Sequence, residues 1–174
     1  MTDPSNPWLG LKIEKVVINI GVGQSGERLA KAQKVLQMVT GQKPVATRAH
    51  STNRDLGIRE GQEIGTKVTL RGTKAIEFVQ RALGTREKQL SEASLDAHGN
   101  FAFGIPDYTD FPGFKYDPQI GIFGMDVCVE IARKGGWRVE RRVRAPRHVG
   151  KGAWVERAET KSFLEKEFDV KFVE

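Results

Sequence analysis

Residues 12–22 read Lys-Ile-Glu-Lys-Val-Val-Ile-Asn-Ile-Gly-Val, and this stretch decides the fold class. Its even-numbered positions from Val16 to Val22 are all apolar and β-branched, whereas its odd-numbered positions mix apolar and polar side chains. An alternation with a period of two is typical of a strand that turns one face to a core. The second face, which carries Lys15 and Asn19, is expected to stay uncovered.

The rest of the chain alternates further strand patterns with helical ones. Strand patterns cover residues 45–50, 66–72, 100–105 and 122–132. Helical spacing of apolar residues covers residues 26–40 and 73–83, and a last amphipathic helix is expected at Thr160. Side-chain caps for these three helices are expected at Ser25, Thr73 and Thr160. This order predicts an α+β fold: a mostly antiparallel sheet with helices packed on one face and an open second face.

One domain accounts for most of the 174 residues. Residues 1–10 contain two prolines and are expected to form a flexible N-terminal arm. Residues 11–174 are expected to form a single domain, with a basic C-terminal extension from about residue 133. Polar residues and glycines gather in residues 51–65, which predicts a long protruding loop.

Cysteine content and hydropathy indicate the compartment. The only cysteine is Cys128, so an internal disulfide and a cysteine-based zinc site are excluded. No apolar run approaches the roughly 20 residues that span a bilayer, and the N-terminus lacks the pattern of a secretory signal. We therefore expect a cytoplasmic protein without a membrane partner.

Positive charge is concentrated in residues 133–151, which we call the basic segment. The segment holds eight basic residues and one acidic residue, so its charge of +7 exceeds the +6 of the whole chain. Its basic residues are Arg133, Lys134, Arg138, Arg141, Arg142, Arg144, Arg147 and Lys151. Such a concentration suits phosphate binding, because each neutralised phosphate releases condensed counterions. The alternative is a charged loop that is merely solvated.

Polar side chains also share the uncovered strand faces. Lys15 and Asn19 lie on one face of the first strand, and Lys67, Thr69 and Arg71 lie on one face of the strand at 66–72. Donors on a rigid sheet can contact sugar hydroxyls, base edges and phosphates of RNA. A solvated sheet face without a ligand is the alternative.

Residues 21–26 form a Gly-x-Gly-x-x-Gly motif between a strand and a helix, as a dinucleotide site requires. A dinucleotide fold also needs an acidic residue about 20 positions further on, yet residues 42–50 contain none. We therefore interpret the glycines as a tight strand-to-helix turn, and a nucleotide-binding enzyme remains the rival hypothesis.

Catalytic and metal-binding patterns are otherwise missing. Asp107, Asp110 and Asp117 alternate with prolines, where short acidic side chains usually bond their own backbone. No histidine follows them at ligand spacing, and no nucleophile motif is present. We expect no catalytic residues, no metal and no cofactor.

Several long motifs resemble one family: the large-subunit ribosomal protein that binds 5S ribosomal RNA, fifth in the bacterial series. They are residues 13–23 (IEKVVINIGVG), 40–45 (TGQKPV), 59–61 (REG), 64–71 (IGTKVTLR), 111–113 (FPG), 116–118 (YDP) and 120–127 (IGIFGMDV). The likeness runs from about residue 12 to the C-terminus, and the basic segment resembles the archaeal and eukaryotic type.

The resemblance implies a structural, non-enzymatic protein of the cytoplasmic ribosome that binds 5S and large-subunit ribosomal RNA. By motif, the RNA-contacting residues are Lys15, Asn19, Gln42, Lys43, Thr69 and Arg71. To these the residue pattern adds Lys67, Arg138, Arg141, Arg142, Arg144, Arg147 and Lys151. No self-association is expected.

In this family a loop, here about residues 48–62, reaches toward the transfer RNA in the peptidyl site and a small-subunit head protein at an intersubunit bridge. Relatives often carry extra lysines after the position of Arg48, where this chain reads Ala-His-Ser-Thr. Arg54 and Arg59, with Arg48, are therefore the candidates for these contacts. A general RNA chaperone is the second rival hypothesis.

Overall fold

The computed structural model describes residues 9–134, 142–148, 150 and 154–173. The strands are β1 (Leu11–Gly21), β2 (Val45–Arg48), β3 (Glu63–Leu70), β4 (Gln89–Ser91), β5 (Phe101–Ile105), β6 (Met125–Arg133) and β7 (Lys171–Val173). The helices are α1 (Glu27–Thr40), α2 (Thr73–Thr85) and α4 (Arg157–Phe168), with short 3-10 turns η2 (Glu92–Ser94) and η3 (Tyr108–Asp110). No helix in these ranges is long and apolar enough to cross a membrane. The expected N-terminal arm lies almost wholly outside the described residues.

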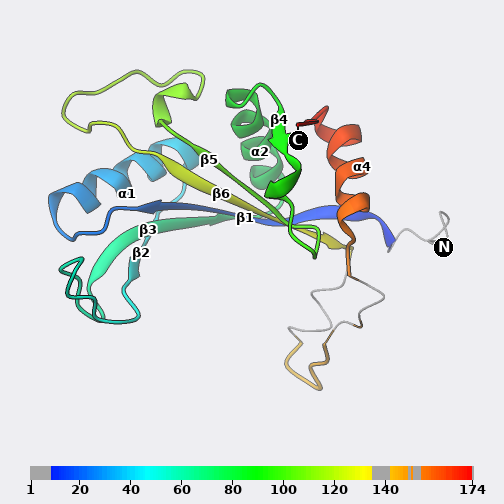
Figure 1. Ribbon diagram of the computed structural model, residues 1–174, viewed down its shortest axis with the longest axis horizontal. Helices are drawn as coiled ribbons and strands as arrows, with labels where there is room; N and C mark the ends of the chain where they lie inside the picture. Colours follow the sequence, from blue (N-terminus) through cyan, green and yellow to red (C-terminus); the bar gives the residue numbers. More distant parts are fainter. Residues whose placement is uncertain (1–8, 135–141, 149, 151–153, 174) are drawn as a thin grey trace.

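The main sheet has five strands in the order β2-β3-β1-β6-β5, and every neighbouring pair is antiparallel. The central strand β1 pairs with β3 on one side and with β6 on the other. Helices α1, α2 and α4 all lie on one face of this sheet (Figure 1). The predicted α+β fold, with helices on a single face, is therefore confirmed.

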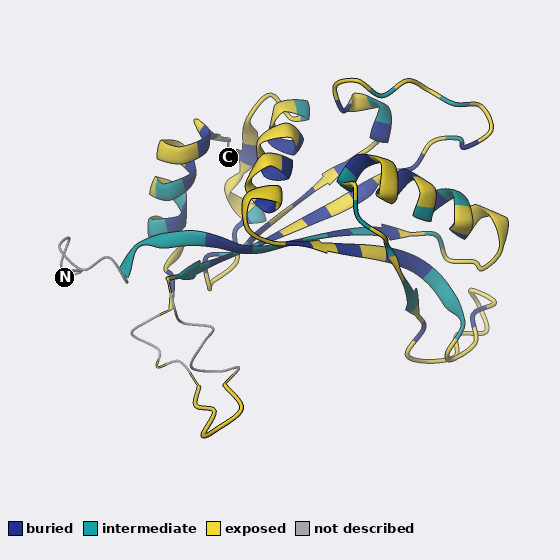
Figure 2. Ribbon diagram, turned by 180° about the vertical axis from the view of Figure 1, so that it is seen from behind, coloured by how far each residue is buried: buried dark blue, intermediate teal, exposed yellow. Residues whose placement is uncertain are grey.

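The core lies between the sheet and the helices. Buried and exposed positions alternate along the strands (Figure 2). From β1, Val16, Ile18 and Ile20 are at most 1% exposed, and they join one apolar cluster with Phe78 of α2 and Leu164 of α4. A single cluster serves all three helices, so the described elements form one domain.

A β-bulge in β1 changes the predicted facing of its first residues. The pairing with β6 shifts between Ile13 and Lys15, so Glu14 is the extra residue. Ile13 is consequently paired with Ile131 and buried in the core, although simple alternation placed it on the open face. The facing predicted for Ile13 was wrong because one inserted residue reverses the alternation.

Helix starts also differ from the expected caps. Gly26 precedes α1 and Gly72 precedes α2, and neither Ser25 nor Thr73 caps its helix. The capping box of α4 is formed by Glu156 and Glu159. Thr160 is instead buried, and its hydroxyl donates a hydrogen bond to the carbonyl of Gly99, so all three cap predictions were wrong.

Residues 49–62 connect β2 to β3, and we call them the hairpin tip. Across its base the N–H of Ala49 donates to the carbonyl of Gln62 at 2.9 Å, and Asn53 forms a bridge with Ile58 further out. The tip extends to the side of the sheet opposite the helices (Figure 1). Because the segment folds back on itself, an open, long protruding loop is not confirmed.

Candidate nucleic-acid interface

The face of the five-stranded sheet opposite the helices is uncovered in the described part of the chain, and we call it the open face (Figure 1). One row of cross-strand neighbours runs from edge to edge through Val45, Lys67, Asn19, Asp126 and Gly104. The next row comprises Thr69, Val17, Cys128 and Ala102. Most of these side chains are small, so the open face is shallow and a flat ligand can approach its backbone.

The structure brings four predicted residues together on this face. Lys15 and Asn19 project from β1, and Lys67 and Thr69 project from β3. Lys67 and Thr69 are exposed, whereas Lys15 and Asn19 are partly buried by their neighbours. Backbone pairing between Asn19 and Lys67 and between Val17 and Thr69 fixes their spacing.

Arg71 lies apart from these four residues, just beyond the end of β3. Its Nη1 atom lies 3.2 Å from Oε1 of Glu14, the bulge residue of β1. Lys12 Nζ lies 2.6 Å from the other carboxylate oxygen of Glu14. Arg71 and Glu14 line a hollow of about 560 Å³ that α2 and α4 also border, so Arg71 reaches toward the helix side.

The open face is divided electrostatically. Lys15 forms an ion pair with Glu130 of β6, and Asp126 of the same strand faces Asn19. Among the described residues, Lys67 forms no ion pair within 4.0 Å. The β2–β3–β1 half is therefore the side suited to an anionic ligand, whereas the β6–β5 half repels one. Alternation along residues 122–132 indicates that Asp126 and Glu130 share a face, but only the strand register shows which residues they lie beside.

A shallow hollow of about 320 Å³ opens at one end of this face, lined by Lys15, Cys128, Asp96 and Asn100 among others. Burial raises the pKa of the Cys128 thiol, and the nearby Asp126 carboxylate raises it further. Partial burial acts to raise the pKa of Asp96, but hydrogen bonds from Asn100 and His98 outweigh it and hold that pKa below its usual value.

The residues predicted by motif between α1 and β2 lie at the edge of the sheet. Gln42 and Lys43 follow Gly41, which ends α1 in the left-handed conformation. Lys43 is exposed, and the backbone N–H of Gln42 donates to Thr40 Oγ1 at 3.3 Å. Both residues precede the edge strand β2, so they border the β2–β3–β1 half of the open face.

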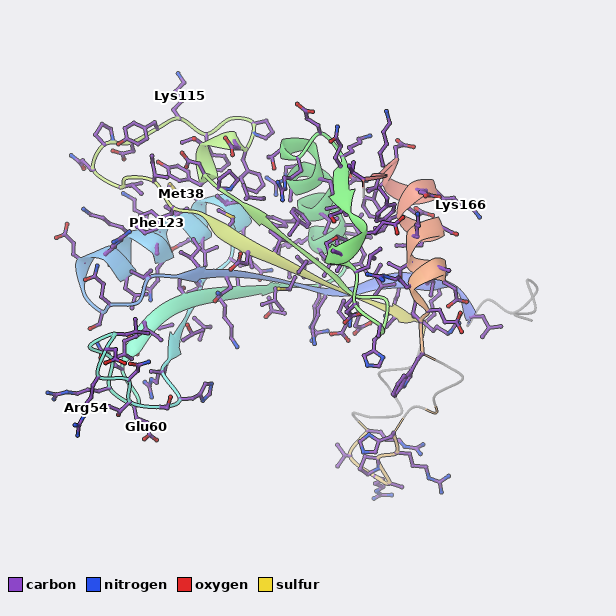
Figure 3. The ribbon with its side chains drawn as sticks, in the orientation of Figure 1. Met38, Arg54, Glu60, Lys115, Phe123 and Lys166 are labelled. Atoms are coloured by element: carbon purple, nitrogen blue, oxygen red, sulfur yellow. The ribbon has the colours of Figure 1, made fainter. Side chains whose placement is uncertain are left out.

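The three arginines predicted for transfer RNA and bridge contacts are all exposed. Arg48 ends β2 and lies 3.5 Å from Glu63 of β3, whereas Arg54 and Arg59 belong to the hairpin tip. Arg54 points outward, away from the sheet, and so does Glu60 (Figure 3). The hairpin tip therefore offers a surface of mixed charge.

The described part of the basic segment lies on the same side of the sheet as the hairpin tip (Figure 1). Arg142, Arg144 and Arg147 are exposed there. The Nε atom of Arg142 donates to the carbonyl of Ala145 at 2.8 Å. The predicted residues Arg138, Arg141 and Lys151 lie outside the described residues.

The glycine motif at residues 21–26 is not built as a phosphate cradle. The N–H groups of Val22 and Gly23 both donate to the carbonyl of Ile64, at 3.0 and 2.8 Å. These donors are occupied by a neighbouring strand, and the main sheet contains no parallel pair that a dinucleotide fold would need. In the described ranges no group of three or more potential ligands is arranged to hold a metal ion.

Family models match the chain in two parts. The model for ribosomal protein L5 matches residues 6–59, and the model for the C-terminus of this ribosomal protein family matches residues 63–172. The two matches meet within the hairpin tip and its junction with β3. Strands from both parts nevertheless interleave in one sheet, because β1 lies between β3 and β6.

Archaeal proteins match nearly the whole chain. The large ribosomal subunit protein uL5 of Thermoplasma acidophilum is 49% identical over 97% of this chain and 99% of its own length. The Thermoplasma volcanium protein of that name is 50% identical over 92% and 95%, and that of Sulfurisphaera tokodaii 47% over 99% and 98%. The resemblance predicted from the sequence motifs is confirmed, including its archaeal type. The chain thus belongs to the L5 family of ribosomal proteins, as a structural, non-enzymatic constituent of the large subunit of the cytoplasmic ribosome.

Proposed function

We propose that this protein binds 5S ribosomal RNA through the β2–β3–β1 half of its open face and thereby helps attach that RNA to the central protuberance of the large subunit. Asn19 and Thr69 supply short-range hydrogen bonds, and Lys67 neutralises phosphate. Gln42 and Lys43 extend this surface at the sheet edge. The observation that carries the proposal is the uncovered polar row around Lys67, on a sheet whose other face is occupied by helices. Lys67 itself is exposed and has no ion-pair partner among the described residues.

The RNA surface that fits is irregular or looped. The deep major groove of A-form RNA cannot be read by side chains, whereas unpaired bases and 2′-hydroxyls can be contacted by a shallow polar face. Lys15 also belongs to this half of the open face, and Arg71, which reaches toward the helix side, is proposed as a separate phosphate contact; each is paired with a carboxylate of the protein. Phosphate must therefore compete with Glu130 and Glu14 for these two cations.

Equilibrium binding of the full chain to Thermoplasma acidophilum 5S ribosomal RNA over a salt series tests this function. Lys67→Ala should weaken binding and lower the slope of log K against log salt by about one, since one phosphate contact is lost. Lys74→Ala removes the same charge from α2, on the covered side, and serves as the matched control. Equal effects of the two substitutions would show that the open face is not the binding surface.

Hydrogen-bonding residues give a second, independent readout. Thr69→Val and Asn19→Ala should reduce the affinity for 5S ribosomal RNA with little change in the salt slope, because neither side chain is charged. Unrelated RNA of equal length separates specific recognition from a general RNA chaperone, which would bind both RNAs equally. Saturable binding of NAD(P) would instead favour the rival nucleotide-binding enzyme.

The exposed arginines of the basic segment are proposed to hold neighbouring large-subunit RNA. Arg142, Arg144 and Arg147 lie on the same side as the open face, which supports a continuous RNA path. Arg138, Arg141 and Lys151 are assigned to this role from the sequence alone. Replacing the three described arginines by glutamine should reduce the affinity for 23S ribosomal RNA more than the affinity for 5S ribosomal RNA.

We also propose that the hairpin tip contacts the transfer RNA in the peptidyl site and a protein of the small-subunit head. The outward direction of Arg54 and the exposure of Arg48 and Arg59 support this role. The double variant Arg54→Ala/Arg59→Ala should leave 5S binding unchanged but reduce crosslinking to transfer RNA in assembled ribosomes. Unchanged crosslinking would remove the hairpin tip from the peptidyl site.

A further inference from the structure

Two aromatic rings from distant parts of the chain meet beside the open face. The ring centroids of His98 and Trp154 lie 4.6 Å apart with an angle of 87° between their planes, an edge-to-face arrangement. His98 is exposed, and Trp154 keeps 44% of its surface exposed. In an edge-to-face arrangement the edge of one ring contacts a face of the other, so the two rings do not cover each other's faces as a stacked pair would. We call these two residues the aromatic pair.

Hydrogen bonds and close packing fix the backbone that carries the aromatic pair. Asp96 accepts hydrogen bonds from the backbone N–H groups of His98 and Asn100, both at 2.8 Å, which fixes the turn that carries His98. Gly99 in this turn packs so closely on Val155 and Thr160 that an added Cβ would lie 2.8 Å from Val155 Cγ1 and 2.5 Å from Thr160 Oγ1. Val155, directly after Trp154, is buried. The two rings are therefore positioned before any ligand arrives.

The basic segment, rather than the hollow beside the pair, indicates a polyanionic ligand. Asp96 and Asn100 of the same turn line the open-face hollow together with Lys15, Cys128 and Glu130, so the pair lies beside the β6–β5 half of the open face. Trp154 also follows the basic segment in the sequence, and the described arginines of that segment lie on the open side of the sheet. Val155 already closes the core at this point, so Trp154 is not needed to cover it.

We propose that the aromatic pair is a stacking site for an unpaired nucleobase of ribosomal RNA, with Trp154 as the stacking residue and His98 as its lateral support. Aromatic side chains bind unpaired bases through their π-faces, largely independently of sequence, while neighbouring cations hold the adjoining phosphates. The inference rests on the proposed RNA-binding function and assigns to it a site that the strand pattern alone does not reveal.

Fluorescence tests the stacking directly. The sequence contains three tryptophans, so Trp8→Phe/Trp137→Phe leaves Trp154 as the only one. This variant is titrated separately with 5S and 23S ribosomal RNA of Thermoplasma acidophilum. Stacking predicts strong quenching of Trp154 emission and protection from acrylamide with at least one of the two RNAs. Emission and acrylamide access that both stay unchanged at saturation with each RNA would overturn the proposal.

Affinity measurements complete the test. Trp154→Ala should weaken binding to the quenching RNA by about tenfold with an unchanged salt slope, and Trp154→Phe should retain most of the affinity because it keeps a ring. Tyr116→Ala is the matched control: Tyr116 is 57% exposed, but it belongs to the connection between β5 and β6. Thermal unfolding of each variant separates loss of stacking from loss of structure. Equal affinity of wild type and Trp154→Ala would also overturn the proposal.

Different results would defeat the stacking site and the proposed 5S function. If the wild-type protein binds 5S and unrelated RNA equally, the proposed 5S function fails, whereas quenching by 23S RNA still supports the stacking site. If Asn19→Ala and Lys67→Ala weaken 5S binding but Trp154 is neither quenched nor required, the stacking site alone fails.

Discussion

At the scale of single residues, Glu14 is a carboxylate in a largely apolar hollow. It is only 8% exposed, and both Arg71 and Lys12 are paired with it. A buried charge is tolerated when its partners remain, but removing a partner leaves it uncompensated. The β-bulge that turns Glu14 inward thus commits Arg71 to a structural role as well as to any contact with RNA.

Arg71→Ala should lower the free energy of unfolding by about 1–3 kcal/mol, less than for a fully buried pair because Arg71 is itself partly exposed. Urea unfolding measures the change. The double variant Glu14→Gln/Arg71→Ala should recover part of the loss, since no unpaired charge then remains. A single variant as stable as wild type would mean that Lys12 alone compensates Glu14. The stability must be known before RNA affinities of Arg71 variants are compared.

Glu130 limits the RNA affinity of the open face through its ion pair with Lys15. Glu130→Gln removes a negative charge beside the proposed RNA and releases Lys15. The affinity for 5S ribosomal RNA should rise about twofold to fivefold, as expected for one unit charge near solvent, and the salt slope should steepen. Glu77→Gln on α2 makes the same change on the covered side and should have little effect. Unchanged affinity in Glu130→Gln would place the RNA away from Lys15.

At the scale of elements, the close approach of strands β2, β3 and β1 depends on one glycine of β3. A Cβ atom at Gly65 would lie 2.7 Å from Thr47 Oγ1 and 3.0 Å from the carbonyl oxygen of Ile20. Gly65→Ala should therefore destabilise the protein by about 1–3 kcal/mol, the usual range for overpacking. Gly21 is its partner across the strands and has open space around it, so Gly21→Ala is the matched control. Thermal unfolding that ranks the two variants equally would contradict this account.

The elements also show what sequence patterns can predict. All five strands of the main sheet and the three helices in the described part of the chain were expected, because the burial of their apolar faces follows the periods of strand and helix. The short parallel pair β4–β7 was missed: each strand has three residues, too few for a pattern, and their pairing depends on where α4 ends. Ser25 resembled a cap, but Gly26 adopts a positive φ of 104° and the helix starts after it.

The candidate RNA-binding site could also be predicted in part from the sequence. Alternation placed Lys15 and Asn19 on one face of their strand, and Lys67, Thr69 and Arg71 on one face of theirs. Four of these five residues lie on the open face, whereas Arg71 reaches toward the helix side. The partners Glu130 and Glu14 depend on strand register and on the bulge, and no local pattern encodes either. The meeting of His98 with Trp154 depends on tertiary packing of segments more than fifty residues apart, so no local sequence pattern reveals it.

At the scale of the whole molecule, the thiol of Cys128 can serve as a chemical probe of which part of the open face the RNA covers. Its thiol is exposed beside Val17, and its raised pKa lowers the thiolate fraction, so free and RNA-bound protein are compared at the same pH. Because Cys128 lies on β6, outside the β2–β3–β1 half, bound 5S ribosomal RNA should change its rate of reaction with a maleimide only slightly. Met38 on α1 is 40% exposed on the helix side, so Cys128→Ser/Met38→Cys should react at the same rate with and without RNA. Strong protection of Cys128 at saturating RNA would instead extend the RNA-binding surface onto β6, against the proposed function.

The order of strands in the sheet also affects synthesis of the protein. β1 is translated first among the strands but occupies the middle of the sheet, and Lys12 of β1 pairs with Ala132 near the end of β6. A nascent chain that has not yet emerged as far as β6 therefore carries a β1 edge with no partner and an apolar surface that is only partly closed. Such edges promote association between chains. A ribosome stalled before β6 emerges should yield an aggregation-prone fragment, even though two thirds of the chain have already been made.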